Sequence, residues 1–238
     1  MLGITTSRRG VGHARALLAA LAMLAALAIW APSAAHASSC TDSWTNAAGG
    51  SWFNGANWST KAAPSSSDEA CITLAGTYTV EMPQTAAAAV TVKALTVGGS
   101  SGTQTLAVES TCSANAVLNV TSGISNGAHG AITLTNGDTC VLNSTVAAAI
   151  TNAGTITAAP GVGGGRFIQG SVTNTGTVAV NQSTTFNAEA LLSNQGAVNI
   201  AEGKQLIVTG AASFTNGTGG KIVTAGNGDV FETGGTVT

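Results

Sequence analysis

Residues 150–158 read Ile-Thr-Asn-Ala-Gly-Thr-Ile-Thr-Ala, and near-copies follow at 172–180 (Val-Thr-Asn-Thr-Gly-Thr-Val-Ala-Val) and 192–200 (Leu-Ser-Asn-Gln-Gly-Ala-Val-Asn-Ile). Each copy has an apolar residue, Ser or Thr, Asn, and then a Gly that opens an alternating strand. Two looser copies complete a set of five, whose Asn residues are Asn126, Asn152, Asn174, Asn194 and Asn216. Successive Asn residues are 26, 22, 20 and 22 positions apart. Self-similarity at this period is typical of stacked repeats, in which each coil buries its apolar face against its neighbours.

The repeated Asn and Gly predict a tight corner, because both tolerate the left-handed backbone region and Asn can bond the local backbone. If the coils stack, we expect the five Asn side chains to form a hydrogen-bonded ladder. The preceding Ser or Thr hydroxyls would form a second ladder, and the apolar residues would line the core. A single copy is explained equally well by a hairpin turn. Five copies favour an all-β chain folded as a parallel β-helix, or solenoid, and an antiparallel β-sandwich is the alternative.

Upstream of the five copies the chain also alternates with period two, which is typical of short strands with one buried face. These segments are 72–74, 80–82, 90–92, 95–97, 106–108 and 118–120. Residues 38–70 differ in composition, since they hold all three tryptophans that follow the N-terminal leader. We therefore expect a Trp-rich N-terminal cap over 38–70 and β-solenoid repeats, with coils of about 20–26 residues, over 71–238.

The first 37 residues have the features of a signal peptide. Arg8, Arg9 and Arg15 form a basic start, residues 16–30 are apolar, and 35–37 give an A-x-A cleavage site. The apolar run is too short for a transmembrane helix. The style of the signal is bacterial. We expect a mature chain from Ser38 that is secreted or displayed on the cell surface, with no membrane insertion once the signal is removed.

Charge is sparse along the predicted mature chain. The whole sequence has eight basic and ten acidic residues, and three of the arginines lie in the signal. The mature chain therefore has five basic residues against ten acids, a net charge of −5. No basic cluster is present, so we expect no binding to nucleic acid. Abundant Val, Ile, Leu, Thr, Asn and Gly suits β-structure with tight corners.

Four cysteines follow the signal, an even count that predicts two disulfides in an exported protein. Three pairings are possible. We favour Cys40–Cys71 and Cys112–Cys140, because nearest neighbours join consecutive parts of a locally stacked fold. Each bond would close a loop of roughly 30 residues, worth about 3–4 kcal/mol in the chain-entropy model. No C-x-x-C spacing is present, and His129 is the one histidine of the mature chain, so we expect no zinc site.

The opening of the mature chain resembles a known family. Trp44, Gly50-Ser51-Trp52 and Asn57-Trp58-Ser59, followed by Pro64 and Asp68, look like the start of passenger regions in large bacterial secreted and autotransporter-like β-solenoid proteins. The later N-x-G-x-[IV] repeats are similar to rungs of those proteins and of filamentous adhesins. The resemblance implies a right-handed parallel β-helix outside the cell or on its surface, engaged in adhesion. It implies no catalytic residue.

Two interpretations apply to Trp44, Trp52 and Trp58. They could form an aromatic platform that contacts sugar rings. Alternatively they plug the open end of the solenoid, which needs a cap to stay soluble. We favour packing, because tryptophan contributes mainly through buried area.

A β-helix can also host polysaccharide lyases and hydrolases, which need paired carboxylates or a calcium cluster with a basic residue. Here Asp138, Glu189 and Glu202 fall at different positions relative to the Asn register, so stacking would not bring them together. Arg166 follows three glycines, where we expect a flexible loop. Residues 226–230 contain a single fragment of a calcium-binding repeat, and such sites need tandem copies. We therefore expect no enzyme activity, no cofactor and no metal.

The residues after each corner Gly contain many threonines, which raises the possibility of a flat ice-binding face. The array of paired threonines there ends after two coils, so we favour ordinary solvated strand threonines.

These features predict an exported structural or adhesion module whose partner is a polysaccharide or a cell-surface protein. The alternatives are a carbohydrate-binding module that uses the tryptophan cap, or a polysaccharide-active β-helix enzyme. The last five residues, 234–238, are strand-like and carry no polar cap. An open strand edge invites pairing, so we expect self-association or continuation in a longer chain through this edge.

Overall fold

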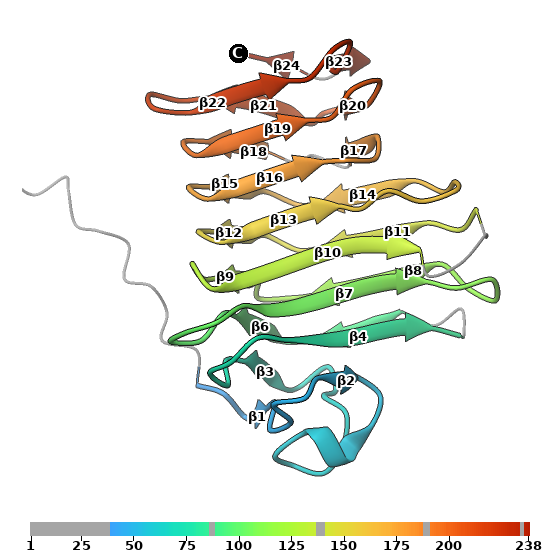
Figure 1. The fold of residues 1–238 in the computed structure, drawn as a ribbon, viewed down its shortest axis with the longest axis vertical. Coiled ribbons are helices and arrows are strands. Elements are labelled where there is room, and N and C mark those ends of the chain that lie inside the picture. The colour runs from blue at the N-terminus through green and yellow to red at the C-terminus, as the bar shows by residue number, and fades with distance from the viewer. Residues whose placement is uncertain (1–38, 86–88, 137–140, 188–190, 234–235) are drawn as a thin grey trace, which may run out of the picture. The chain divides into compact units, whose positions relative to one another are not determined.

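A computed structural model describes residues 39–85, 89–136, 141–187, 191–233 and 236–238, with the side chains of 231–233 excluded. These residues form three parallel sheets stacked as a β-solenoid of about 8 turns (Figure 1). Every strand pairing within the described residues is parallel, and the two antiparallel contacts there are isolated bridges. The predicted parallel β-helix is therefore confirmed, and the antiparallel sandwich is wrong. The predicted signal peptide lies outside the described residues.

After the first coil, which has strands in sheets 1 and 2 only, each coil visits the three sheets in the same order, starting from sheet 1. The strands of sheet 1 described here are β1 (Asp42–Ser43), β3 (Glu69–Ile72), β6 (Ala94–Val97), β9 (Ile124–Asn126), β12 (Ile150–Asn152), β15 (Val172–Asn174), β18 (Leu191–Asn194), β21 (Ser213–Asn216) and β24 (Thr236–Val237). Those of sheet 2 are β2 (Gly50–Ser51), β4 (Tyr78–Gln84), β7 (Gln104–Ser110), β10 (Gly130–Asn136), β13 (Thr155–Ala158), β16 (Thr177–Val180), β19 (Ala197–Ile200) and β22 (Lys221–Thr224). Those of sheet 3 are β5 (Val90–Val92), β8 (Ala116–Val120), β11 (Ser144–Ala147), β14 (Arg166–Gln169), β17 (Thr184–Asn187), β20 (Gln205–Thr209) and β23 (Asp229–Thr233).

The coil is right-handed. In Figure 1 the chain runs from left to right through sheet 2, which faces the viewer, and returns from right to left behind it while rising toward the C-terminal coils. The one helical segment among the described residues is the single 3-10 turn η2 (Gly55–Asn57). In the described part of the chain, no helix has the length and apolar character needed to cross a membrane.

The core consists of inward columns in which equivalent residues of successive coils stack on one another. The apolar residue of the five-copy motif forms one such column, and all of its members are buried: Ile124, Ile150, Val172, Leu192 and Phe214. Alternation along each strand places the neighbouring side chains outward. The alternating residues of the period-two sequence pattern are therefore the inward-facing and outward-facing side chains of the strands.

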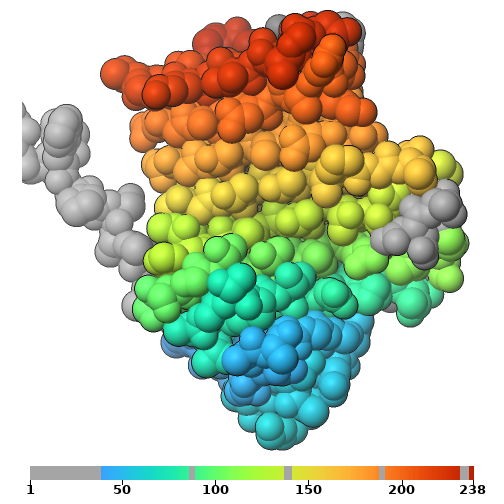
Figure 2. Space-filling view, in the orientation of Figure 1, coloured from blue at the N-terminus to red at the C-terminus, as the bar shows by residue number. Residues whose placement is uncertain are grey.

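The solenoid narrows along its length. Strands β4, β7 and β10 of sheet 2 have seven residues each, whereas β13, β16 and β19 have four. Figure 2 shows the corresponding change, with the green and yellow coils broader than the orange ones. The pairing of β10 with β13 thus ends at Leu134, before the end of β10.

Candidate functional site

The corner between sheets 1 and 2 contains the predicted asparagine ladder. The Nδ2 group of each Asn donates to the Oδ1 atom of the Asn one coil later. The distance is 2.6 Å for Asn126–Asn152 and Asn152–Asn174, and 2.7 Å for Asn174–Asn194 and Asn194–Asn216. Each Nδ2 also donates across to a backbone oxygen of the next coil, at 3.1–3.2 Å. The first four side chains are buried, and Asn216 is exposed.

The ladder begins where its motif begins. In the preceding coil, Val97 takes the position of Asn126, so the Oδ1 atom of Asn126 has no hydrogen-bond partner among the described residues. In that coil, the corner is bonded instead by a side-chain amide from a different strand. Gln104, the buried first residue of β7, accepts from the Gly99 backbone N–H at 2.5 Å and donates to the Ser101 oxygen at 2.9 Å. Gln104 lies outside the Asn register, so the repeat in the sequence did not indicate it.

The corner glycines have a different physical cause from the one the sequence suggested. Gly154, Gly176 and Gly196 do not adopt positive φ, and among the described residues Lys61 alone does so without being glycine. A Cβ atom at these glycines would instead lie 2.1–2.2 Å from the backbone oxygen of the equivalent glycine one coil earlier. Close approach of stacked coils, and not left-handed backbone, requires glycine there.

The three tryptophans fill the N-terminal end of the core. Trp44, Trp52 and Trp58 are 2%, 1% and 0% exposed, and Trp58 packs edge-on against both of the others at ring-centroid distances of 5.1 and 4.8 Å. The indole of Trp58 donates to the Trp52 backbone oxygen at 2.8 Å. Tyr78 stacks on Trp44, and burial raises the pKa of Tyr78 to about 12. No ring face is open to a sugar, so the glycan-contact interpretation of these tryptophans is wrong and their role is packing.

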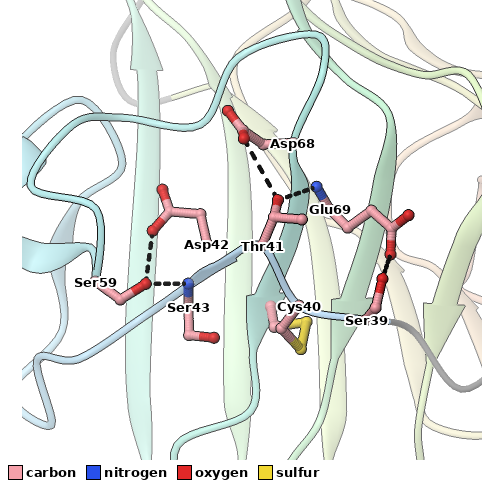
Figure 3. The surroundings of a disulfide bond; sticks show 9 residues. Ser39, Cys40, Thr41, Asp42, Ser43, Ser59, Asp68 and Glu69 are labelled. Carbon is pink, nitrogen blue, oxygen red and sulfur yellow. Dashed lines mark hydrogen bonds between the residues drawn. A yellow bond between two sulfur atoms is a disulfide. The ribbon is translucent and has the colours of Figure 1, made fainter.

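A disulfide fixes the same end of the molecule. Cys40 is bonded to Cys71 of β3, as predicted, and the bond joins positions 31 residues apart. Figure 3 shows the segment around Cys40 held to the start of β3, with the Ser39 hydroxyl donating to Glu69 and the Glu69 backbone N–H donating to the Thr41 hydroxyl. The disulfide indicates a non-reducing setting. Cys112 is disulfide-bonded as well, and its predicted partner, Cys140, lies outside the described residues.

The expectation that Arg166 lies in a flexible loop is wrong. It is the first residue of β14, and its side chain points into the core with no exposed surface. The guanidinium donates to the backbone oxygen of Leu134 at 3.1 Å and to the Asn136 side chain at 2.9 Å, with two longer bonds to backbone oxygens. Burial lowers the pKa of Arg166 from its ordinary value. No carboxylate among the described residues pairs with it.

The outer face of sheet 1 has a continuous column of hydroxyl residues. The residue before each ladder Asn points outward, and the column also includes Thr96 upstream: Thr96, Ser125, Thr151, Thr173, Ser193 and Thr215. The hydroxyls of Thr215 and Thr238 lie 3.1 Å apart, so a hydrogen bond extends the column by one coil. Strand spacing places successive hydroxyl residues roughly 4.8 Å apart along the stack.

The outer face of sheet 2 is also built from small residues. Two outward columns contain only Thr and Ala from β7 to β16: Thr105, Ala131, Thr155 and Thr177 in one, and Ala107, Thr133, Thr157 and Ala179 in the other. Thr105 adds an upstream threonine to the first column, but Ala131 separates it from Thr155, so the uninterrupted threonines still span two coils in each column.

Over the middle coils, the described residues of these two faces carry no charge. Among the described residues between 111 and 201, Arg166 is the sole Asp, Glu, Lys or Arg, and it is buried. The two acids that the sequence has in this interval, Asp138 and Glu189, lie outside the described residues. His129 is exposed, with Nδ1 2.9 Å from the Gly102 oxygen. The described residues of the middle coils thus present uncharged surfaces rich in hydroxyl groups.

The described residues contain no group of three or more His, Cys, Asp or Glu side chains that could hold a metal ion. The chain matches no protein-family model, no curated protein and no solved structure.

Proposed function

We propose that this chain is an exported, non-catalytic structural module of a bacterial surface or secreted protein, and that it adheres to an uncharged, hydroxyl-bearing partner. The contact surfaces are the outer faces of sheets 1 and 2. A neutral polysaccharide has the chemistry that fits them, since its hydroxyl groups both donate to and accept from Ser and Thr side chains.

The observation that carries the proposal is the scarcity of charge between residues 111 and 201, where the one described charged side chain is buried and the two acids, Asp138 and Glu189, lie outside the described residues. A surface without charge does not attract an acidic or basic partner over distance. Its contacts must come from hydrogen bonds and close packing, and both require a partner that approaches a flat face along many coils. Stacked Thr, Ser and Ala provide such a face.

The contacts that stabilise the interior of the solenoid support the structural part of the proposal. Polar atoms at the sheet 1 to sheet 2 corner bond from coil to coil through the Asn ladder, and a disulfide and three packed tryptophans fix the N-terminal end. A rigid solenoid of this kind keeps its outer columns in register, which an extended contact needs.

A pull-down of the oxidised chain on insoluble polysaccharides tests the proposal, with released sugar assayed in the same tubes. The panel should contain neutral and acidic polymers of similar texture. We expect saturable binding to neutral polymers, little change between low and high salt, and no released sugar. Binding confined to acidic polymers, or release of sugar, would contradict the proposal. Binding to none of the polymers would favour a protein partner.

A further inference from the structure

The step at which the solenoid narrows forms a ledge at the end of β10. Seven residues of β10 pair with β7 in the coil before it, but only four residues of β10 pair with β13 in the coil after it. The pairing with β13 ends at Leu134, so the contacts at the ledge come from outside β13. The Thr135 oxygen accepts from the Ser144 hydroxyl, and the Asn136 side chain accepts from Arg166.

Arg166 and the loop of residues 159–165 cover the ledge. The guanidinium bonds both sides of the step: the Leu134 oxygen and Asn136 Oδ1 on β10, and the backbone oxygens of Ala159 and Gly164 on the loop. Asn136 completes the arrangement, because its Nδ2 group donates to the Gly163 oxygen at 3.0 Å. The loop is thus joined to the preceding coil by Arg166 and Asn136, and also by Asn143, whose Oδ1 atom accepts from the Gly165 backbone N–H at 2.7 Å.

The glycine at position 161 is part of the same contact. A Cβ atom there would lie 2.0 Å from Asn136 Oδ1 and 2.8 Å from Nη2 of Arg166. The loop backbone therefore lies directly against the Arg166–Asn136 hydrogen bond. No side chain larger than glycine fits without displacing that pair.

The coils before and after the step are joined differently. In the wide coils a side chain at the end of a sheet 2 strand reaches the next coil: Gln84 bonds the backbone of Val117, and Ser110 bonds the Leu142 oxygen. In the narrow coils the position equivalent to Arg166 holds Thr184, whose hydroxyl bonds within its own coil. Arg166 lies at the junction between the wide coils, in which a side chain bonds the next coil, and the narrow coils, in which the equivalent side chain bonds within its own coil.

We propose that Arg166 is a latch that couples the wide N-terminal coils to the narrow C-terminal coils, so that the solenoid opens as one cooperative unit. In a linear array each coil is stabilised by its neighbours, and cooperativity is lost first at the weakest junction. Without the guanidinium, the backbone oxygens of Leu134, Ala159 and Gly164 each lose one hydrogen-bond donor at the step. The array then divides between β10 and β13 into two parts that open separately.

Amide hydrogen exchange of the full oxidised chain, measured peptide by peptide, tests the latch. For Arg166→Met we expect exchange to rise at least about tenfold in β13, β16 and β19, with that of β4 and β7 unchanged. Thr184→Val, one coil further along the same column, is the matched control and should produce no such division. An equal rise in both parts would overturn the proposal, as would unchanged exchange throughout.

Gly161→Ala provides a second test, because it opens the latch from the loop side while the guanidinium remains. It should divide the exchange pattern at the same junction as Arg166→Met. This variant keeps the proposal falsifiable if Arg166→Met fails to fold. A Gly161→Ala chain with the exchange pattern of the unmodified protein would count against the latch.

Discussion

Asn152 and Asn174 share a buried hydrogen bond of 2.6 Å, although 22 residues separate them in the sequence. The same bond recurs between each consecutive pair from Asn126 to Asn216, and every amide points the same way along the stack. Aligned bonds of this kind polarise one another in a low-dielectric interior. The ladder therefore satisfies buried amides and also fixes the register of successive coils.

Removing a central member of the ladder should be costly. Asn174→Ala leaves the Nδ2 of Asn152 and the Oδ1 of Asn194 without their ladder partners, so we expect a loss of about 2–3 kcal/mol in the free energy of unfolding. Asn216→Ala is the control, because this exposed terminal member has a ladder partner on one side only; it should cost under about 1 kcal/mol. Urea denaturation measures both. Equal losses for the two variants would show that stacking, and not the ladder, holds the corner.

Two neighbouring aromatic residues of the cap, one buried and one exposed, allow a role in packing to be distinguished from a role in surface contact. Trp52 is 1% exposed and Phe53 is 46% exposed. We expect Trp52→Ala to destabilise the chain by about 3–5 kcal/mol, through the cavity left beside Trp58. Phe53→Ala should change stability by no more than about 0.5 kcal/mol. Thermal unfolding distinguishes them, and a stable Trp52→Ala chain would contradict the packing role.

The Cys40–Cys71 disulfide should contribute to stability by restricting the unfolded chain. For a separation of 31 residues the chain-entropy model gives about 3–4 kcal/mol. We expect a Cys40→Ala, Cys71→Ala double variant to lose about this much in urea denaturation. A loss below about 1 kcal/mol would show that the native contacts of Ser39 and Thr41 already hold the segment in place.

The junction between the cap and the first complete coil predicts a loss of stability in acid. The hydroxyl and backbone N–H of Ser65 lower the pKa of Asp68, and the Lys93 ammonium, at 2.7 Å, lowers the pKa of Glu69. With a folded-state pKa below the unfolded value, each carboxylate stabilises the native state above its ordinary pKa. That contribution is lost as pH falls through the lowered value.

We therefore expect the melting temperature to fall on acidification below about pH 4.5, where unfolded carboxylates begin to take up protons. Asp68→Asn should flatten this dependence, and Asp229→Asn, at an exposed position in β23, is the control for the loss of one acidic side chain. Melting curves between pH 2 and 6 compare the three chains. An identical acid slope in all of them would remove Asp68 from the explanation.

The repeat of the Asn motif within one strand type made the stacked coils predictable from the sequence. It placed the ladder correctly, since residues equivalent in the repeat must be neighbours in a parallel stack. It did not find Gln104, which brings an amide to the corner from the following strand where Val97 replaces Asn. The change in the width of the coil was also not foreseen, because strand lengths in sheet 2 depend on which residues find partners in the adjacent coil.

Two outcomes could not be derived from the local sequence. Arg166 follows a glycine-rich run, which locally indicates a mobile loop, yet it is buried, with its guanidinium bonded to Asn136 at the end of β10, 30 positions earlier. The tryptophans could have faced a sugar or the core, and only the three-dimensional packing of Trp58 between the other two decides for the core. Both depend on contacts between segments distant in sequence.

The central claim is that the uncharged faces make the adhesive contact. The most direct test compares the binding of charge variants to a neutral insoluble polysaccharide. Thr151→Lys with Thr173→Lys places charge on sheet 1, Thr155→Lys with Thr177→Lys places it on sheet 2, and Thr91→Lys with Thr185→Lys, on sheet 3, is the control. We predict at least about tenfold weaker binding for one or both of the first two and unchanged binding for the third. Equal binding by all three variants and the unmodified chain would contradict the account.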